Sequence, residues 1–137
     1  MTQNDLPYII SDVLNTKTIN KEKVKINSYV LTHAKGLKPT TTVSVSFQGE
    51  VIERRGSGDG QFDAFMNALR KIYKRKGEKL PVLTDYAVRI PPGSNSDALC
   101  ETLITWNLKG KEYKTRGLDS DQTVSAIMAT EKMLNMI

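Results

Sequence analysis

The sequence contains very few of the side chains that enzymes most often use for chemistry. Its 137 residues include one cysteine, Cys100, and one histidine, His33. Cys100 has no partner for an internal disulfide, and its apolar surroundings indicate a small core residue rather than a nucleophile. His33 has no cysteine pair or carboxylate cluster at ligand spacing near it, so neither a metal site nor a catalytic triad is indicated. We therefore expect no catalytic site and no cofactor in this chain.

Long hydrophobic runs are also missing. No apolar stretch approaches the roughly 18 residues that a membrane helix requires, and the N-terminus lacks the features of a secretory signal. Hydrophobic residues make up 39% of the chain and charged residues 26%, which is typical of one globular domain. From these absences and from the low cysteine content we expect a cytoplasmic protein without a membrane partner.

Negative charge is scarcer than positive charge, and the formal net charge is +5. Six of the basic residues fall between positions 70 and 79, at the end of a predicted helix. Cations there complement the helix dipole, and no stacking aromatics are interleaved with them as single-strand binders require. We therefore favour a solvated helix face. A basic α+β nucleic-acid-binding module, resembling a double-stranded RNA binder, stays open as an alternative.

What the chain does have is an internal repeat. The segment GEVIERRGSGDGQFDAFMNAL begins at Gly49, and GKEYKTRGLDSDQTVSAIMAT begins at Gly110, an offset of 61 residues (110 − 49). At this offset Gly56 aligns with Gly117. Three further identities are Arg55 with Arg116, Gln61 with Gln122, and Ala68 with Ala129. The repeat predicts one supersecondary unit used twice, and a seam between like units is a common place for a small ligand.

Hydrophobic periodicity predicts the same elements in each copy. Alternation indicates strands at 24–32, 43–47 and 50–55, then at 83–90, 98–108 and 111–116. On the first strand the alternation places Val24, Ile26, Ser28, Val30 and Thr32 on one face. A helix follows each set of strands, the first with one apolar stripe and an expected cap at Asp59, the second with caps among residues 119–121. The fold class is α+β, with two pseudo-repeated β-β-β-α units and antiparallel sheets, preceded by a short linker helix at 5–14.

The glycine-rich turn before the first helix is the best candidate for binding. Gly56, Gly58 and Gly60 allow close approach of the backbone, and a helix start receives carboxylates well. The turn lacks the Lys-Ser/Thr of a nucleotide loop, and a plain strand-to-helix corner is the simpler interpretation. An amino-acid ligand would also need a carboxylate for its ammonium group and an apolar hole. The candidates for these are Asp59, Asp63 or Asp97, and Phe62, Phe65, Leu83 and Ile90.

The same turn carries a family resemblance. GSGDGQFDAFMNAL, from Gly56, resembles the G-N-G-P-V-D-A motif of the C-terminal regulatory domain of 2-isopropylmalate synthase and its relative citramalate synthase. LTDYAV, from Leu83, resembles the family's L-x-D-Y-x-V strand, and Ser96-Asp97-Ala98 resembles its G-x-D-A turn. RGLDSD, from Arg116, resembles the G-x-G-x-x-x-D start of its last helix, and Thr40–Val43 stands in place of P-T-A-x-V. The resemblance covers about residues 24–135.

The resemblance implies a dimerising domain that binds leucine or, in citramalate synthases, isoleucine near the interface of its two units. Binding there inhibits a separate catalytic barrel, an acyltransferase that condenses acetyl-CoA with a 2-oxo acid and uses a divalent metal held partly by two histidines. With His33 alone, this chain cannot contain that barrel. The implied organisation is a linker remnant at 1–23 and a regulatory domain at 24–137, with units at about 24–79 and 80–137.

The family's effector contacts carry over by position. The predicted effector-binding residues are Gly58, Asp59, Gly60, Phe62, Asp63, Phe65, Ile90, Asp97 and Ala98. Two residues depart from the family pattern: Gln61 replaces a proline and restores an N–H donor, and Phe62 replaces a smaller aliphatic residue and narrows the pocket. Leucine and isoleucine both stay open as the effector, and so does a purely structural dimerisation domain.

Overall fold

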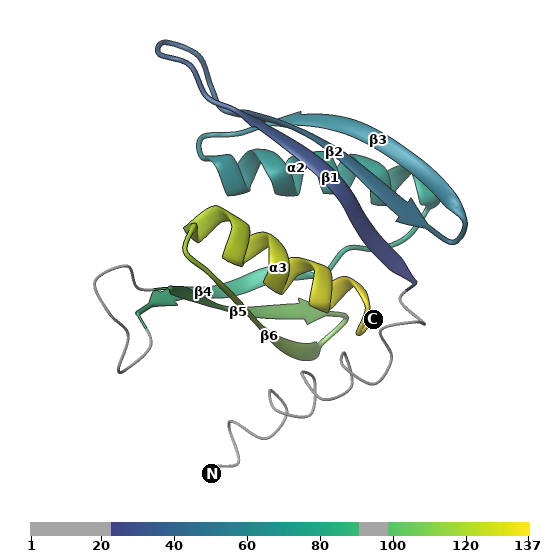
Figure 1. The fold of residues 1–137 in the computed structure, drawn as a ribbon. Helices are drawn as coiled ribbons and strands as arrows, with labels where there is room; N and C mark the ends of the chain where they lie inside the picture. Colours follow the sequence, from purple (N-terminus) through teal and green to yellow (C-terminus); the bar gives the residue numbers. More distant parts are fainter. Residues whose placement is uncertain (1–22, 91–98) are drawn as a thin grey trace. The chain divides into compact units, whose positions relative to one another are not determined.

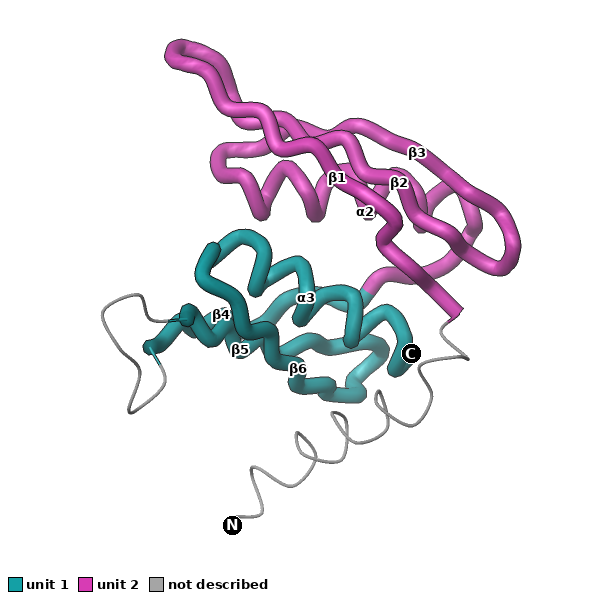
Figure 2. The backbone as a smooth tube through the Cα atoms, viewed as in Figure 1, with its two compact units in different colours: residues 1–22, 81–137 teal, residues 23–80 magenta. Residues whose placement is uncertain are grey.

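The computed structural model describes residues 23–90 and 99–137, which form two compact units. The N-terminal unit comprises residues 23–80 (magenta in Figure 2), and the C-terminal unit comprises the described part of residues 81–137 (teal). The helix predicted at 5–14 and the predicted site residues Asp97 and Ala98 lie outside the described residues.

Each unit is a three-stranded antiparallel meander followed by a helix that packs on one face of the sheet (Figure 1). The N-terminal unit contains β1 (Val24–Thr32), β2 (Thr40–Phe47), β3 (Glu50–Ser57) and α2 (Gln61–Lys76). The C-terminal unit contains β4 (Val82–Arg89), β5 (Cys100–Leu108), β6 (Lys111–Asp119) and α3 (Gln122–Leu134). The expectation of an α+β fold built from two β-β-β-α units is therefore confirmed.

The second hairpin of each unit has the same turn geometry. Gln48 and Gly49 have φ values of 52° and 81°, and their repeat partners Lys109 and Gly110 have φ values of 53° and 84°. Two consecutive residues with positive φ are typical of a type I′ turn, whose twist matches that of the flanking strands. In each unit the third strand therefore runs back along the middle strand after a turn at equivalent positions, as the alignment of Gly49 with Gly110 predicts.

The core of each unit lies between the middle strand and the helix. In the N-terminal unit, Val43 and Val45 of β2 are fully buried against Phe65, Leu69 and Ile72 of α2. In the C-terminal unit, Ile104 and Trp106 of β5 take the equivalent places, 61 residues later. Full burial of such a side chain stabilises a fold by about 1.5–3 kcal/mol. The predicted apolar stripe of α2 is confirmed by this packing.

The prediction of which β1 side chains share a face with Val24 and Ile26 is wrong for the residues after Ile26. Pairing with β2 shifts register between Ile26 and Ser28, which indicates a β-bulge. After the bulge Tyr29 and Leu31 are the half-buried residues of the strand, whereas Val30 is 61% exposed. Because side chains alternate with a period of two, one extra residue moves all later positions to the opposite face. Strand β4 has the same irregularity between Leu83 and Asp85.

The aligned glycines Gly56 and Gly117 are where strand and helix come closest. A Cβ atom on Gly56 would lie 2.3 Å from the backbone nitrogen of Ala68, and one on Gly117 would lie 1.7 Å from the carbonyl oxygen of Ser125. Neither position has room for any side chain. The repeated glycine is therefore explained by helix packing against the third strand, not by turn flexibility.

We expect Gly117→Ala to lower the free energy of unfolding by at least about 2 kcal/mol, because the added methyl group overlaps helix backbone that cannot move aside. Gly56→Ala should act in the same direction with a smaller effect. Urea denaturation followed by circular dichroism measures both. Gly60→Ser is the matched control, since a Cβ there meets no atom within 4 Å and its φ is −127°; a glycine pair no more sensitive than Gly60 would contradict the packing explanation.

Candidate functional site

The turn from Ser57 to Asp63, which we call the β3–α2 corner, is held by two hydrogen bonds to its backbone and by a close approach of Gly58 to α2. The N–H of Gly58 donates to the carbonyl of Pro39 at 3.2 Å, and Asn67 Nδ2 donates to the carbonyl of Ser57 at 2.6 Å. A Cβ on Gly58 would lie 2.8 Å from the nitrogen of Ala64, so glycine is required there by close contact with the helix. The corner is thus fixed against both the preceding loop and α2. No sequence pattern indicated the contact between this corner and Asn67.

The cap of α2 differs from the prediction. The N-cap residue is Gly60, in an extended conformation and with no side-chain cap, and Asp59 precedes it by one residue. The expected role of Asp59 as cap is therefore wrong. Instead, the N–H of Asp59 donates to Asp63 Oδ2 at 3.3 Å, which draws the Asp63 carboxylate back over the first turn. Asp59 itself is exposed and lies 3.6 Å from Lys38 Nζ.

The equivalent corner of the C-terminal unit is capped by a side chain. Asp121, the repeat partner of Gly60, accepts a hydrogen bond from the N–H of Val124 at 3.0 Å. Asp119 supports it by accepting from the N–H of Asp121 at 2.9 Å. The prediction of caps among residues 119–121 is confirmed. Of the two helix starts, only that of α2 lacks a side-chain acceptor at the N-cap, although both carry the positive end of a helix dipole.

The corner brings together five of the predicted site residues: Gly58, Asp59, Gly60, Phe62 and Asp63. Phe62 is half-buried, and its ring stacks on that of Phe65 with centroids 6.0 Å apart.

Two further predicted site residues, Phe65 and Ile90, lie outside the corner. Phe65 is fully buried in the core of the N-terminal unit, where it also meets Tyr29 edge-to-face. Ile90 belongs to the C-terminal unit and is 66% exposed.

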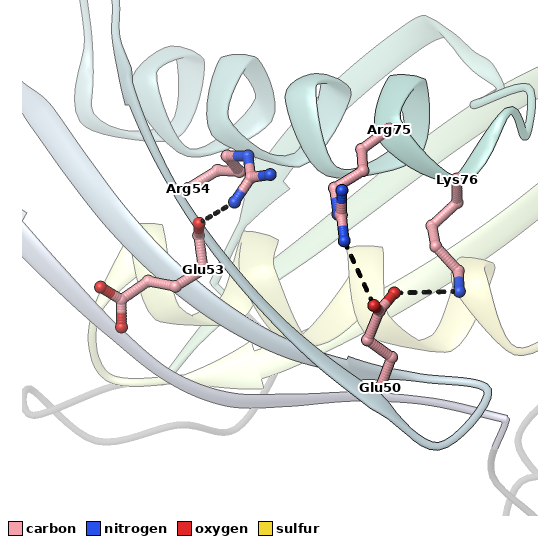
Figure 3. A network of polar contacts seen from close by, with 5 residues as sticks. All are labelled: Glu50, Glu53, Arg54, Arg75 and Lys76. Atoms are coloured by element: carbon pink, nitrogen blue, oxygen red, sulfur yellow. Dashed lines mark hydrogen bonds and ion pairs between the residues drawn. The ribbon is translucent and has the colours of Figure 1, made fainter.

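Much of the basic cluster on α2 is engaged within its own unit. Glu50, at the start of β3, accepts hydrogen bonds from Lys76 Nζ at 3.2 Å and from Arg75 Nη2 at 3.3 Å (Figure 3). Lys71 Nζ donates to the carbonyl of Arg55 at 2.7 Å. These contacts support the interpretation of the cluster as a helix face that docks on β3, and they leave fewer cations for phosphates.

The Glu50 carboxylate has a lowered pKa. The hydrogen bond and positive charge of Lys76 contribute most, Arg75 adds to them, and partial desolvation acts in the opposite direction. On β3, Glu53 makes no ion pair within the described residues, and in Figure 3 its carboxylate points away from the cations. The two glutamates therefore form a natural comparison of a paired and an unpaired carboxylate on one strand.

Over residues 23–90 and 99–137, no group of three or more His, Cys, Asp or Glu side chains is placed to hold a metal ion. Within these same ranges no helix has the length and hydropathy to cross a bilayer. Cys100 is half-buried, with its Sγ 4.0 Å from the carbonyl of Ser120.

The fold defines a class of protein: a tandem of β-β-β-α units, each with a glycine packed under its helix. Comparison with protein families narrows the class further. The model of the LeuA allosteric (dimerisation) domain matches residues 1–137, and the chain belongs to this family. The resemblance that the sequence motifs indicated is thereby confirmed.

The relatives that match this chain are longer proteins. It is 30% identical over 120 residues to a 2-isopropylmalate synthase of Aquifex aeolicus, a match that covers 87% of this chain and 22% of the relative. It is 28% identical to a candidate (R)-citramalate synthase, CimA, of Methanosarcina mazei, and 26% identical to a 2-isopropylmalate synthase of Methanocaldococcus jannaschii. Those two matches cover all of this chain and 28% and 26% of the relatives. The chain thus spans about a quarter of the length of these proteins.

Among solved structures, the chain aligns with the two double-stranded-RNA-binding domains of DRB4 at 13% identity and a TM-score of 0.28, over 93% of this chain and 94% of that one. A score this low supports neither a common fold nor a common function.

The lowered pKa of Glu50 predicts how stability depends on pH. A carboxyl group with a folded-state pKa below its ordinary 4.5 stabilises the fold above that value, and the contribution is lost as the pH falls through the folded-state pKa. We expect Glu50→Gln to lower the urea midpoint near pH 7 and to have progressively less effect as the pH falls below 4.5. Glu53→Gln is the matched control, because the Glu53 carboxylate makes no ion pair within the described residues; equal profiles for the two variants would contradict the role of Glu50.

Proposed function

We propose that this chain is an amino-acid-binding allosteric domain that mediates feedback inhibition of a 2-isopropylmalate synthase by leucine. Isoleucine, acting on a citramalate synthase, is the alternative effector, because relatives of both names match the chain. The observation that carries the proposal is the helix start of α2. Where the C-terminal unit places the Asp121 carboxylate, the N-terminal unit places Gly60, which supplies no carboxylate of its own to the positive end of the helix dipole.

The corner offers a matching group for each part of an amino acid. The ligand's carboxylate would lie at the N-terminus of α2, where the dipole favours negative charge. Its ammonium group would face Asp59 or Asp63, which both lie at the corner and are exposed. The half-buried ring of Phe62 would contact its aliphatic side chain. Contacts from Ile90, Asp97 and Ala98 are part of the proposal through the family resemblance alone.

Inhibition needs two states of the parent enzyme with different affinity for the effector. A coupling of about 1–3 kcal/mol is typical and would change apparent affinity 5- to 150-fold. In this proposal the domain forms a homodimer, as the name of its family indicates. It would act in the cytoplasm on an acyltransferase barrel that condenses acetyl-CoA with 2-oxoisovalerate.

Titration calorimetry of the chain with leucine and isoleucine tests the proposal. We expect measurable binding of one of them, and we expect Gly60→Asp to abolish it, because the new carboxylate would occupy the helix start. The same substitution should leave the fold intact or stabilise it by a few tenths of a kcal/mol, since aspartate is a better cap than glycine.

Asp121→Gly is the matched control for this experiment. It removes the cap of α3, so it should lower stability by a few tenths of a kcal/mol and leave binding unchanged. Flat titrations with all branched-chain amino acids would refute the proposal and favour a structural dimerisation domain. Full binding by Gly60→Asp would show that the effector binds elsewhere.

A further inference from the structure

A groove of about 320 Å³ lies in the N-terminal unit and adjoins the β3–α2 corner through Lys38, whose Nζ lies 3.6 Å from Asp59 Oδ1. Its lining residues are Thr32, Ala34, Leu37, Lys38, Thr40 and Arg55. The registers of β1, β2 and β3 place Thr32, Thr40 and Arg55 on the sheet face opposite α2, because the buried Thr41 and Val43 face the helix. The loop between β1 and β2 closes one end, with Leu37 N–H bonded to the Ala34 carbonyl at 3.1 Å.

The groove is rich in positive charge and poor in negative charge. The chain carries no aspartate or glutamate from residue 23 to residue 49, a stretch that contributes five of the six lining residues. Lys38 lies 3.6 Å from Asp59, but the two side chains are 74% and 90% exposed, and ion pairs of this kind contribute little. None of the six lining residues is acidic, so an anion that enters the groove competes with the exposed Asp59 for Lys38 but meets no carboxylate on the walls themselves.

The internal repeat supplies a comparison for Arg55. Its partner in the C-terminal unit, Arg116, bonds to Glu101 at 3.4 Å, and Arg89 contacts the same carboxylate from the other side. The Glu101 side chain is only 6% exposed. At the position of Glu101 the N-terminal unit has Thr40, 61 residues earlier in the same strand register. Within residues 23–90 and 99–137, the guanidinium group of Arg55 has no hydrogen-bond or ion-pair partner.

We propose that this groove binds a small aliphatic monocarboxylate, whose carboxylate group takes the place that Glu101 occupies beside Arg116. The planar guanidinium of Arg55 suits a two-point contact with a carboxylate, and Lys38 adds a second cation. Ala34, Leu37 and the methyl groups of the two threonines form an apolar wall for a short hydrocarbon chain. A volume of about 320 Å³ is at the small end of the range for ligand sites. The proposal does not depend on the effector site at the corner.

Isovalerate is the probe that separates the two sites, because it has a carboxylate and a branched chain but no ammonium group. In an NMR titration of the chain we expect shifts confined to the amides of the lining residues. Arg55→Gln should weaken binding at least tenfold. Arg70→Gln, with the same loss of charge on the exposed face of α2, is the matched control and should bind within twofold of the natural chain.

Thr40→Glu gives a sharper test, because it copies Glu101 into the N-terminal unit and supplies Arg55 with an internal carboxylate. We expect this variant to fold and to lose isovalerate binding, while its response to leucine stays unchanged. Inorganic phosphate binding at the same amides with equal affinity would contradict the monocarboxylate and indicate a general anion site. The absence of shifts with isovalerate, or equal binding by Arg55→Gln and the natural chain, would overturn the proposal.

Discussion

The contact on which each unit depends is the approach of its helix to the third strand at a glycine. At Gly56 and Gly117 helix backbone occupies the space that a side chain would need. This close approach brings α2 and α3 down onto the middle strands, where Val43, Val45, Ile104 and Trp106 are buried. It also limits how far each helix can lie from the third strand of its sheet. Any chemistry at the β3–α2 corner therefore rests on a packing constraint located one turn away.

The two units have the same fold, but they differ in whether their positively charged positions are paired with carboxylates of the same unit. The C-terminal unit satisfies its own cationic positions, with Asp121 at its helix start and Glu101 between Arg89 and Arg116. At the same two positions the N-terminal unit has Gly60 and Thr40. Because the fold is the same, these differences are not required by the architecture. In both proposals an external carboxylate takes the position that an internal carboxylate occupies in the C-terminal unit.

The basic surface of the chain has a structural explanation that composition did not give. A net charge of +5 permits a nucleic-acid interpretation, but Lys71, Arg75 and Lys76 bond to groups of β3. These contacts join the far end of α2 to the strand that already touches it at Gly56. The helix is thereby held at both ends, so the cluster contributes to docking of α2 as well as to solubility.

Local sequence patterns were sufficient to predict most of the fold. The offset of 61 residues identified both units. A turn with two positive-φ residues and a glycine in the third strand each restrict which amino acids can occupy those positions, so both are visible in the sequence itself. The apolar stripe of Phe65, Leu69 and Ile72 indicated α2 for the same reason.

Only the tertiary structure decided three other features. These are the bulge that turns Tyr29 toward the helix, the shift of the α2 cap from Asp59 to Gly60, and the burial of Phe65 away from the corner. Each depends on contacts between segments far apart in the chain, such as Gly58 with Pro39 and β1 with β2. Sequence periodicity indicates which residues share a face of a helix or strand. The packing of one element against another determines which face is buried and which residue caps a helix.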